Sequence, residues 1–151
     1  LDDDYATVQV VAGRPGPRTP EGQLDPVLVL LTTRGGAVVE IEAFVNASYG
    51  YEVRCEVVGS EGTVEMGDGA YLTRRAERVV GHDVPELWLG RFEDAYRRQL
   101  QAWVDATLIG RTSGATAWDG LLATITANAA VDAITEGPQV IDLQERPALY
   151  A

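Results

Sequence analysis

The apolar residues of this chain change their spacing near residue 80, and this change constrains the fold more than any other feature. Before it, several segments alternate apolar and polar residues with a period of two, as in residues 38–45, which is typical of strands with one buried face. After it, apolar residues recur every three or four positions, which is typical of helices. Strands followed by helices predict an α+β fold, an open, mostly antiparallel sheet with two main helices packed on one face.

The predicted sheet is an antiparallel meander. Its strands are expected at Tyr5–Ala12, Val27–Thr33, Val38–Val45, Val53–Val57, Thr63–Met66 and Tyr71–Thr73, with short strands at Arg78–Val80 and Val140–Leu143. Gly35-Gly36 predicts a two-residue type I′ hairpin turn, because both central residues of that turn need positive φ. The run Val27–Leu31 is apolar on both faces, which predicts a strand covered on both sides.

Two helices are predicted in the second half of the chain. Arg91–Leu108 carries one apolar stripe, and Glu93 and Asp94 are expected in its first turn, where carboxylates complement the helix dipole. Thr116–Glu136 forms the second helix. Thr116 followed by Asp119 resembles a capping box, and we interpret Asp119 as a capping carboxylate.

Composition excludes several classes of partner. The net charge is −11, with all twelve basic residues being arginine, so nucleic acid and anionic membrane surfaces are disfavoured. No apolar run approaches the ~18 residues of a membrane span. The single cysteine predicts a reducing, cytoplasmic location. Because the chain lacks an initiator methionine and a signal peptide, we expect a single domain cut from a longer protein.

Few side chains could carry chemistry. His82 lies beside Asp83 on a predicted loop, and a surface histidine is the preferred interpretation. The absence of lysine excludes Schiff-base chemistry within this chain. No spacing of cysteines and histidines predicts a metal site, and Cys55 is interpreted as a core residue of its strand. A glycine-rich phosphate loop is also missing. The chain is therefore expected to lack catalytic residues of its own.

Three motifs are nevertheless familiar in their order and spacing. Residues 48–62 read Ser-Tyr-Gly-Tyr-Glu-Val-Arg-Cys-Glu-Val-Val-Gly-Ser-Glu-Gly, residues 91–96 read Arg-Phe-Glu-Asp-Ala-Tyr, and residues 117–123 read Ala-Trp-Asp-Gly-Leu-Leu-Ala. Together they resemble the C-terminal domain of the Gfo/Idh/MocA oxidoreductases, especially the myo-inositol 2-dehydrogenase branch. The resemblance covers about residues 27 to 143.

The resemblance implies a longer enzyme with an N-terminal Rossmann domain that holds NAD and that this chain does not contain. The full-length protein would oxidise a cyclic polyol or sugar, using a lysine and an Asp/His pair that have no counterpart here. Tyr51, and less directly Tyr49, would bind the substrate, and Tyr96 would approach the nicotinamide. The open sheet face would pack on another subunit of a homo-oligomer.

Other interpretations stay open from the sequence. The two tyrosines could simply pack on the sheet around a turn glycine, and Tyr96 could belong to the core. A loop of the same chain could cover the sheet face. The chain could also be a stand-alone dimerisation or sugar-binding module without catalysis. If it is an oxidoreductase, its substrate could be a sugar other than inositol, or a non-sugar.

Overall fold

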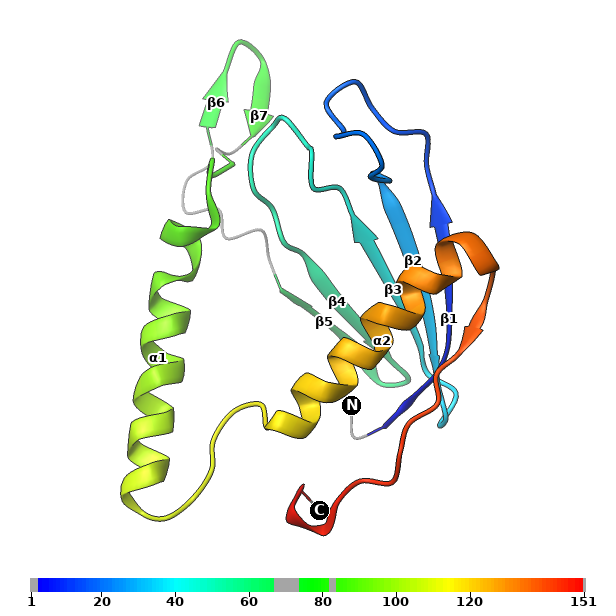
Figure 1. Ribbon diagram of the computed structural model, residues 1–151. Helices are drawn as coiled ribbons and strands as arrows, with labels where there is room; N and C mark the ends of the chain where they lie inside the picture. Colours follow the sequence, from blue (N-terminus) through cyan, green and yellow to red (C-terminus); the bar gives the residue numbers. More distant parts are fainter. Residues whose placement is uncertain (1–2, 67–73, 82–83, 151) are drawn as a thin grey trace. The chain divides into compact units, whose positions relative to one another are not determined.

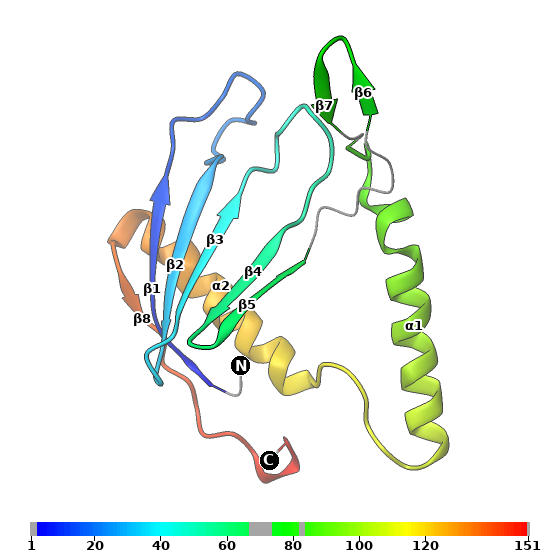
Figure 2. The ribbon, with the colours of Figure 1, turned by 180° about the vertical axis from the view of Figure 1, so that it is seen from behind.

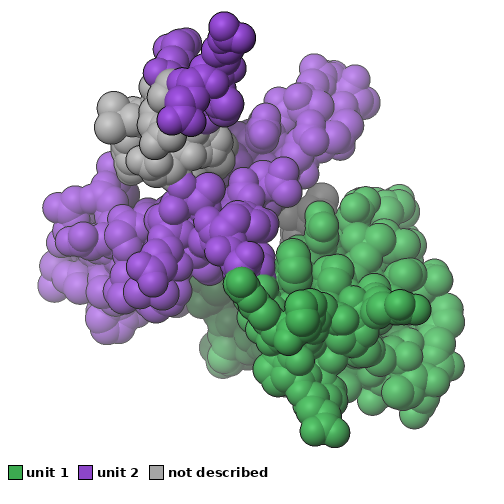
Figure 3. Space-filling view, turned by 90° about the horizontal axis from the view of Figure 1, so that it is seen from above, with its two compact units in different colours: residues 1–46, 115–151 green, residues 47–114 purple. Residues whose placement is uncertain are grey.

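The structure, a computed structural model, describes residues 3–66, 74–81 and 84–150. It divides into two compact units. The first, which we call the sheet–helix unit, comprises residues 1–46 and 115–151, and the second, the hairpin–helix unit, comprises residues 47–114. Figure 3 colours the two units separately.

The sheet–helix unit contains a four-stranded antiparallel sheet covered on one face by a helix (Figures 1 and 2). The strand order is β3-β2-β1-β8, with β1 at Tyr5–Ala12, β2 at Val27–Thr33, β3 at Val38–Ala43 and β8 at Gln139–Val140. The covering helix is α2, Ala117–Glu136. The predicted α+β class is confirmed, although β8 is shorter than expected and begins one residue earlier.

The core of this unit lies between the sheet and α2. Val8 of β1 and Leu31 of β2 are direct cross-strand partners, and both are buried with Ala133 of α2 and Ile141. Ile141 follows β8 and donates its backbone N–H to Ala6 O at 2.8 Å. Burying each of the larger aliphatic side chains contributes about 1.5–3 kcal/mol. Ile125 and Ala129 of α2 pack against this core on the same side as Ala133, so one face of the helix packs on the sheet.

The other face of the sheet is only partly covered. Leu28 and Leu30 point away from α2 and are half-buried, while Thr32 on the same face is exposed. Leu30 is flanked in register by Gln9 and Glu40, both exposed. Among the described residues of this unit, α2 covers one face of β2, whereas its sequence predicted cover on both.

The turn between β2 and β3 differs from the predicted type I′ turn. Only Gly36 has a positive φ, +90°, and Gly35 does not. Thr33 N donates to Ala37 O at 2.9 Å, and Gly36 N donates to Thr33 O at 3.1 Å. These bonds define a three-residue loop in which the last residue is left-handed. The glycine pair located the hairpin correctly, but it could not distinguish a two-residue loop from a three-residue loop.

The hairpin–helix unit contains two hairpins and one long helix. The first hairpin pairs β4, Cys55–Gly59, with β5, Gly62–Met66, and the second pairs β6, Arg74–Ala76, with β7, Val79–Gly81. The helix is α1, Trp88–Leu108. The strand predicted at residues 71–73 lies outside the described residues. Of the helices that the structure describes, neither has the length and apolar character needed to cross a membrane.

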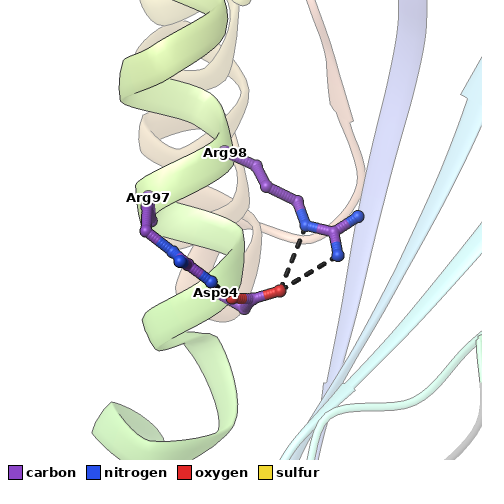
Figure 4. Close-up of polar contacts among 3 residues, drawn as sticks. All are labelled: Asp94, Arg97 and Arg98. Atoms are coloured by element: carbon purple, nitrogen blue, oxygen red, sulfur yellow. Dashed lines mark hydrogen bonds and ion pairs between the residues drawn. The ribbon is translucent and has the colours of Figure 1, made fainter.

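Helix α1 begins three residues earlier than predicted. It starts at Trp88, and its N-cap residue Leu87 makes no capping bond with its side chain. Glu93 and Asp94 consequently lie beyond the first turn, so the expected charge–dipole interaction at the helix start is wrong. Asp94 instead accepts hydrogen bonds from Arg97 and Arg98 on the same face (Figure 4). The Arg97 hydrogen bond is the main reason why the pKa of Asp94 is lowered.

Helix α2 begins with the predicted capping box. Thr116 Oγ1 accepts from Asp119 N at 3.3 Å, and Asp119 Oδ2 accepts from Thr116 N at 2.6 Å. We expect Thr116→Ala to destabilise the sheet–helix unit by about 1 kcal/mol, measured by urea denaturation. Thr124→Ala is the matched control, because that hydroxyl only bonds back to Gly120 O within the helix. Equal losses in the two variants would contradict a capping role.

Two aspartates of this unit should make its stability depend on acid pH. The hydroxyl of Thr33 and the N–H of Gly35 lower the pKa of Asp3 below its ordinary 3.8, and the backbone and hydroxyl of Thr116 do the same for Asp119. A lowered folded-state pKa stabilises the fold above the unfolded-state value. That stabilisation is expected to disappear as the pH falls below 3.8. In acid titrations, Asp119→Asn should lose less stability than the parent chain, and an unchanged acid slope would contradict this.

Candidate functional site

The segment Tyr49-Gly50-Tyr51 lies in close contact with the backbone that precedes α1. Gly50 has φ +124°, and a Cβ at this position would lie 2.7 Å from Pro85 O and 2.8 Å from Val84 Cγ1. The next residue, Tyr51, donates its backbone N–H to Pro85 O at 2.7 Å. Because only glycine has both the required φ and the missing side chain, Gly50 allows this contact to form.

The N-terminal part of α1 contacts the residues that follow this glycine. The rings of Tyr51 and Phe92 meet edge to face, with centroids 6.2 Å apart and an interplanar angle of 84°. Arg91 Nη2 donates to Val53 O at 2.6 Å, and its guanidinium carbon lies 5.4 Å from the centre of the Phe92 ring. Tyr51 is therefore half-buried and held in one place, as a ligand-orienting residue requires.

The two tyrosines of the segment differ in exposure. Tyr49 is 59% exposed, whereas Tyr51 is half-buried. A phenol hydroxyl can both donate and accept a hydrogen bond, and this suits the vicinal hydroxyls of a polyol. Ring packing and backbone hydrogen bonds therefore hold Tyr51 in place, whereas the side chain of Tyr49 is mostly exposed.

Tyr96 lies two helical turns after Trp88, and their rings form an edge pair with centroids 5.7 Å apart. Tyr96 is 51% exposed and Trp88 is 40% exposed, so neither belongs to a core of the described residues. Trp88 was not singled out from the sequence because the helix was expected to begin after it. A helix start read three residues earlier would have placed both rings on one face.

The remaining candidates do not add reactive groups to this site. His82 lies outside the described residues. Cys55 was predicted to be buried but is exposed, because both strands of its hairpin, β4 and β5, are exposed along their whole length. Asp119 is the capping carboxylate described above. The described part of the chain contains no group of three His, Cys, Asp or Glu residues that could hold a metal ion.

Among the described residues, Tyr51, Phe92 and Arg91 thus form a cluster of two aromatic rings, one phenol hydroxyl and one guanidinium. A family model described as the oxidoreductase family, C-terminal alpha/beta domain, matches residues 1–143. The chain belongs to the Gfo/Idh/MocA oxidoreductase family. The resemblance seen in the three sequence motifs is confirmed, and with it the α+β architecture of this family's C-terminal domain.

Individual relatives agree with this assignment. The chain is 41% identical to the inositol 2-dehydrogenase of Streptomyces avermitilis and 40% identical to that of Paracoccus denitrificans, over 99% and 100% of its length. Among solved structures it matches the myo-inositol dehydrogenase of Lactobacillus casei in complex with NAD(H) and myo-inositol, with TM-score 0.89 and 33% identity. The match covers 44%, 46% and 46% of these three proteins. The chain therefore spans less than half the length of the relatives that it matches.

Proposed function

We propose that this chain is the substrate-side domain of a longer NAD-dependent oxidoreductase that takes a hydride from a cyclic polyol such as myo-inositol. The observation that carries this proposal is the match along the whole chain to inositol dehydrogenases, one of them solved with NAD(H) and myo-inositol. The half-buried, supported Tyr51 agrees with it, because it offers one oriented hydroxyl to a ring hydroxyl of the substrate.

The nicotinamide cofactor would supply the hydride acceptor, and we assign its binding to the part of the protein that precedes this chain. The sheet described here is antiparallel and lacks the βαβ turn that cradles a pyrophosphate. The residues of this chain would bind and orient the polyol, with Tyr51 as the principal contact and Tyr49 as a more exposed second contact. Tyr96, paired with Trp88, would approach the nicotinamide side.

This domain alone should not catalyse the reaction. Removing the hydroxyl proton of the polyol needs a general base near the reacting carbon. The sequence contains no lysine and a single histidine. We therefore assign proton transfer to the region that precedes this chain.

We also place the full-length protein in the cytoplasm, because the single cysteine of this chain fits a reducing compartment.

We also propose that the sheet face opposite α2, which is only partly covered, joins copies of the protein into a homo-oligomer. Leu28 and Leu30 of β2 lie on this face, with the exposed Val11 and Val38 on the neighbouring strands. A subunit packed on this face would complete the cover that the apolar sequence of β2 predicts.

Tyr51→Phe in the full-length enzyme tests the substrate assignment. Loss of one hydrogen bond to the polyol should lower kcat/KM for myo-inositol by about fivefold to tenfold, measured by steady-state kinetics. Tyr150→Phe is the matched control, since it removes a hydroxyl from a half-buried tyrosine far along the chain, in the short 3₁₀ helix Ala148–Tyr150. An unchanged kcat/KM for Tyr51→Phe would remove this residue from the site.

A further inference from the structure

Asp25 is a buried carboxylate that the proposed chemistry does not use. It is 3% exposed and lies at the end of the loop between β1 and β2. Its Oδ1 accepts from Val45 N at 2.9 Å, and its Oδ2 accepts from Asn46 N and Asn46 Nδ2, both at 2.8 Å. All three donors come from two consecutive residues just after β3. The carboxylate therefore binds one short piece of chain.

The ionised state of Asp25 is what makes this attachment strong. Burial raises the pKa of Asp25, but the bonds from the backbone and side chain of Asn46 and from Val45 outweigh it, and the pKa is lowered overall. A buried charge that lost these donors would be costly. The Val45–Asn46 backbone is thus held by hydrogen bonds to a charged acceptor, which are stronger than bonds between neutral groups.

The residues that Asp25 binds lie just before the tyrosine segment in the chain. Asn46 is the last residue of the sheet–helix unit before the chain enters the other unit at Ala47. The tyrosine segment follows within a few residues. On its far side the segment is held by the bond from Tyr51 N to Pro85 O and by Arg91 on Val53 O. The segment therefore follows directly on a residue that Asp25 anchors, and within its own unit it is held by these two bonds.

We propose that Asp25 is a positioning residue for substrate binding: it fixes the start of the tyrosine segment and, through it, the place of the Tyr51 hydroxyl. This inference rests on the proposed function for its kinetic consequence but not for its structural one. A displacement of the order of 1 Å in a binding group can lower catalysis strongly, so the anchor matters although Asp25 does not itself contact the polyol.

Hydrogen exchange of the full-length protein tests the structural part. Asp25→Asn keeps the size of the side chain but replaces one acceptor oxygen by an amide nitrogen; at the Oδ1 position this nitrogen faces Val45 N, and one bond is lost while Oδ2 keeps both of its donors. The amides of residues 45–51 are expected to exchange about tenfold faster, the loss of one charge-assisted bond, while those of α2 stay unchanged. Asp119→Asn, which disturbs the other aspartate anchor of the same unit, should leave residues 45–51 unaffected.

Unchanged exchange at residues 45–51, or equal acceleration in α2, would overturn the proposal. If Asp25→Asn does not fold, the same exchange experiment on Asn46→Ala tests the proposal instead. It removes only the Nδ2 donor and leaves the carboxylate with two backbone donors. It should accelerate exchange at the same residues by about threefold, a smaller factor because the acceptor stays a charged carboxylate and keeps both backbone donors. The absence of that acceleration would also overturn the proposal.

A double-mutant cycle tests the kinetic part. Asp25→Asn should lower kcat/KM for myo-inositol about tenfold in the parent enzyme and much less in the Tyr51→Phe background, because the two residues act through one hydroxyl. Equal effects in both backgrounds would show that Asp25 only stabilises the fold. If Tyr51→Phe alone has no kinetic effect, the substrate assignment fails, and the exchange data still decide whether Asp25 fixes the segment.

Discussion

Leu31→Ala is expected to destabilise the sheet–helix unit by about 3 kcal/mol, within the range for buried leucines. Leu31 is 2% exposed and packs with Val8, Ala133 and Ile141 between β2 and α2. Truncation removes buried apolar atoms and leaves a cavity that the surrounding backbone of sheet and helix cannot fill. Urea denaturation, followed by circular dichroism, measures the loss.

Ile41→Ala provides the control for this experiment. Ile41 lies on the same face of the sheet in the neighbouring strand β3, but it is 46% exposed. Its truncation should cost less than half as much, because little apolar surface returns to water. Equal losses for Leu31 and Ile41 would contradict the core described here.

Gly50→Ala should have a comparably large effect, about 2–4 kcal/mol, concentrated in the hairpin–helix unit. The added Cβ meets Pro85 O and Val84, and φ +124° strains any residue other than glycine. The expected result is that the tyrosine segment leaves Pro85 and the Tyr51 N–H exchanges faster with solvent. Hydrogen exchange of that amide measures the effect, together with kcat/KM of the full-length enzyme.

Gly62→Ala is the matched control for the glycine substitution. Gly62 opens β5 in the same unit, has no positive φ, and has no atom within 4 Å of the built Cβ. Alanine should be accepted there with little change. A result in which Gly50→Ala behaves like Gly62→Ala would mean that the close approach to Pro85 does not hold the segment.

Local signals predicted much of the fold. Strand β1 could be predicted from alternation, β2 from its apolar run and the α2 capping box from the Thr116–Asp119 spacing. All three are short-range features of the sequence. The start of α1 was misplaced because Leu87 makes no side-chain cap, so no polar residue marks the boundary. Cys55 was misjudged because alternation indicates which residues share a strand face but not whether anything covers that face.

The candidate site was less accessible to sequence reasoning. Tyr51 and Tyr49 came from a family resemblance, and no spacing along the chain indicates that Gly50 lies against Val84 and Pro85. The Asp25 anchor joins residues that are about twenty positions apart. Such contacts depend on how β2 and β3 pair, which decides the neighbours of a loop that follows them.

NAD reduction by the full-length protein, measured with a panel of cyclic polyols and sugars, tests the central claim most directly. We expect reduction with myo-inositol or a closely related cyclic polyol, and no reduction by the 151-residue chain alone. Binding of a polyol by the full-length protein, with no NAD reduction on any member of the panel, would contradict it and indicate a binding module without catalysis.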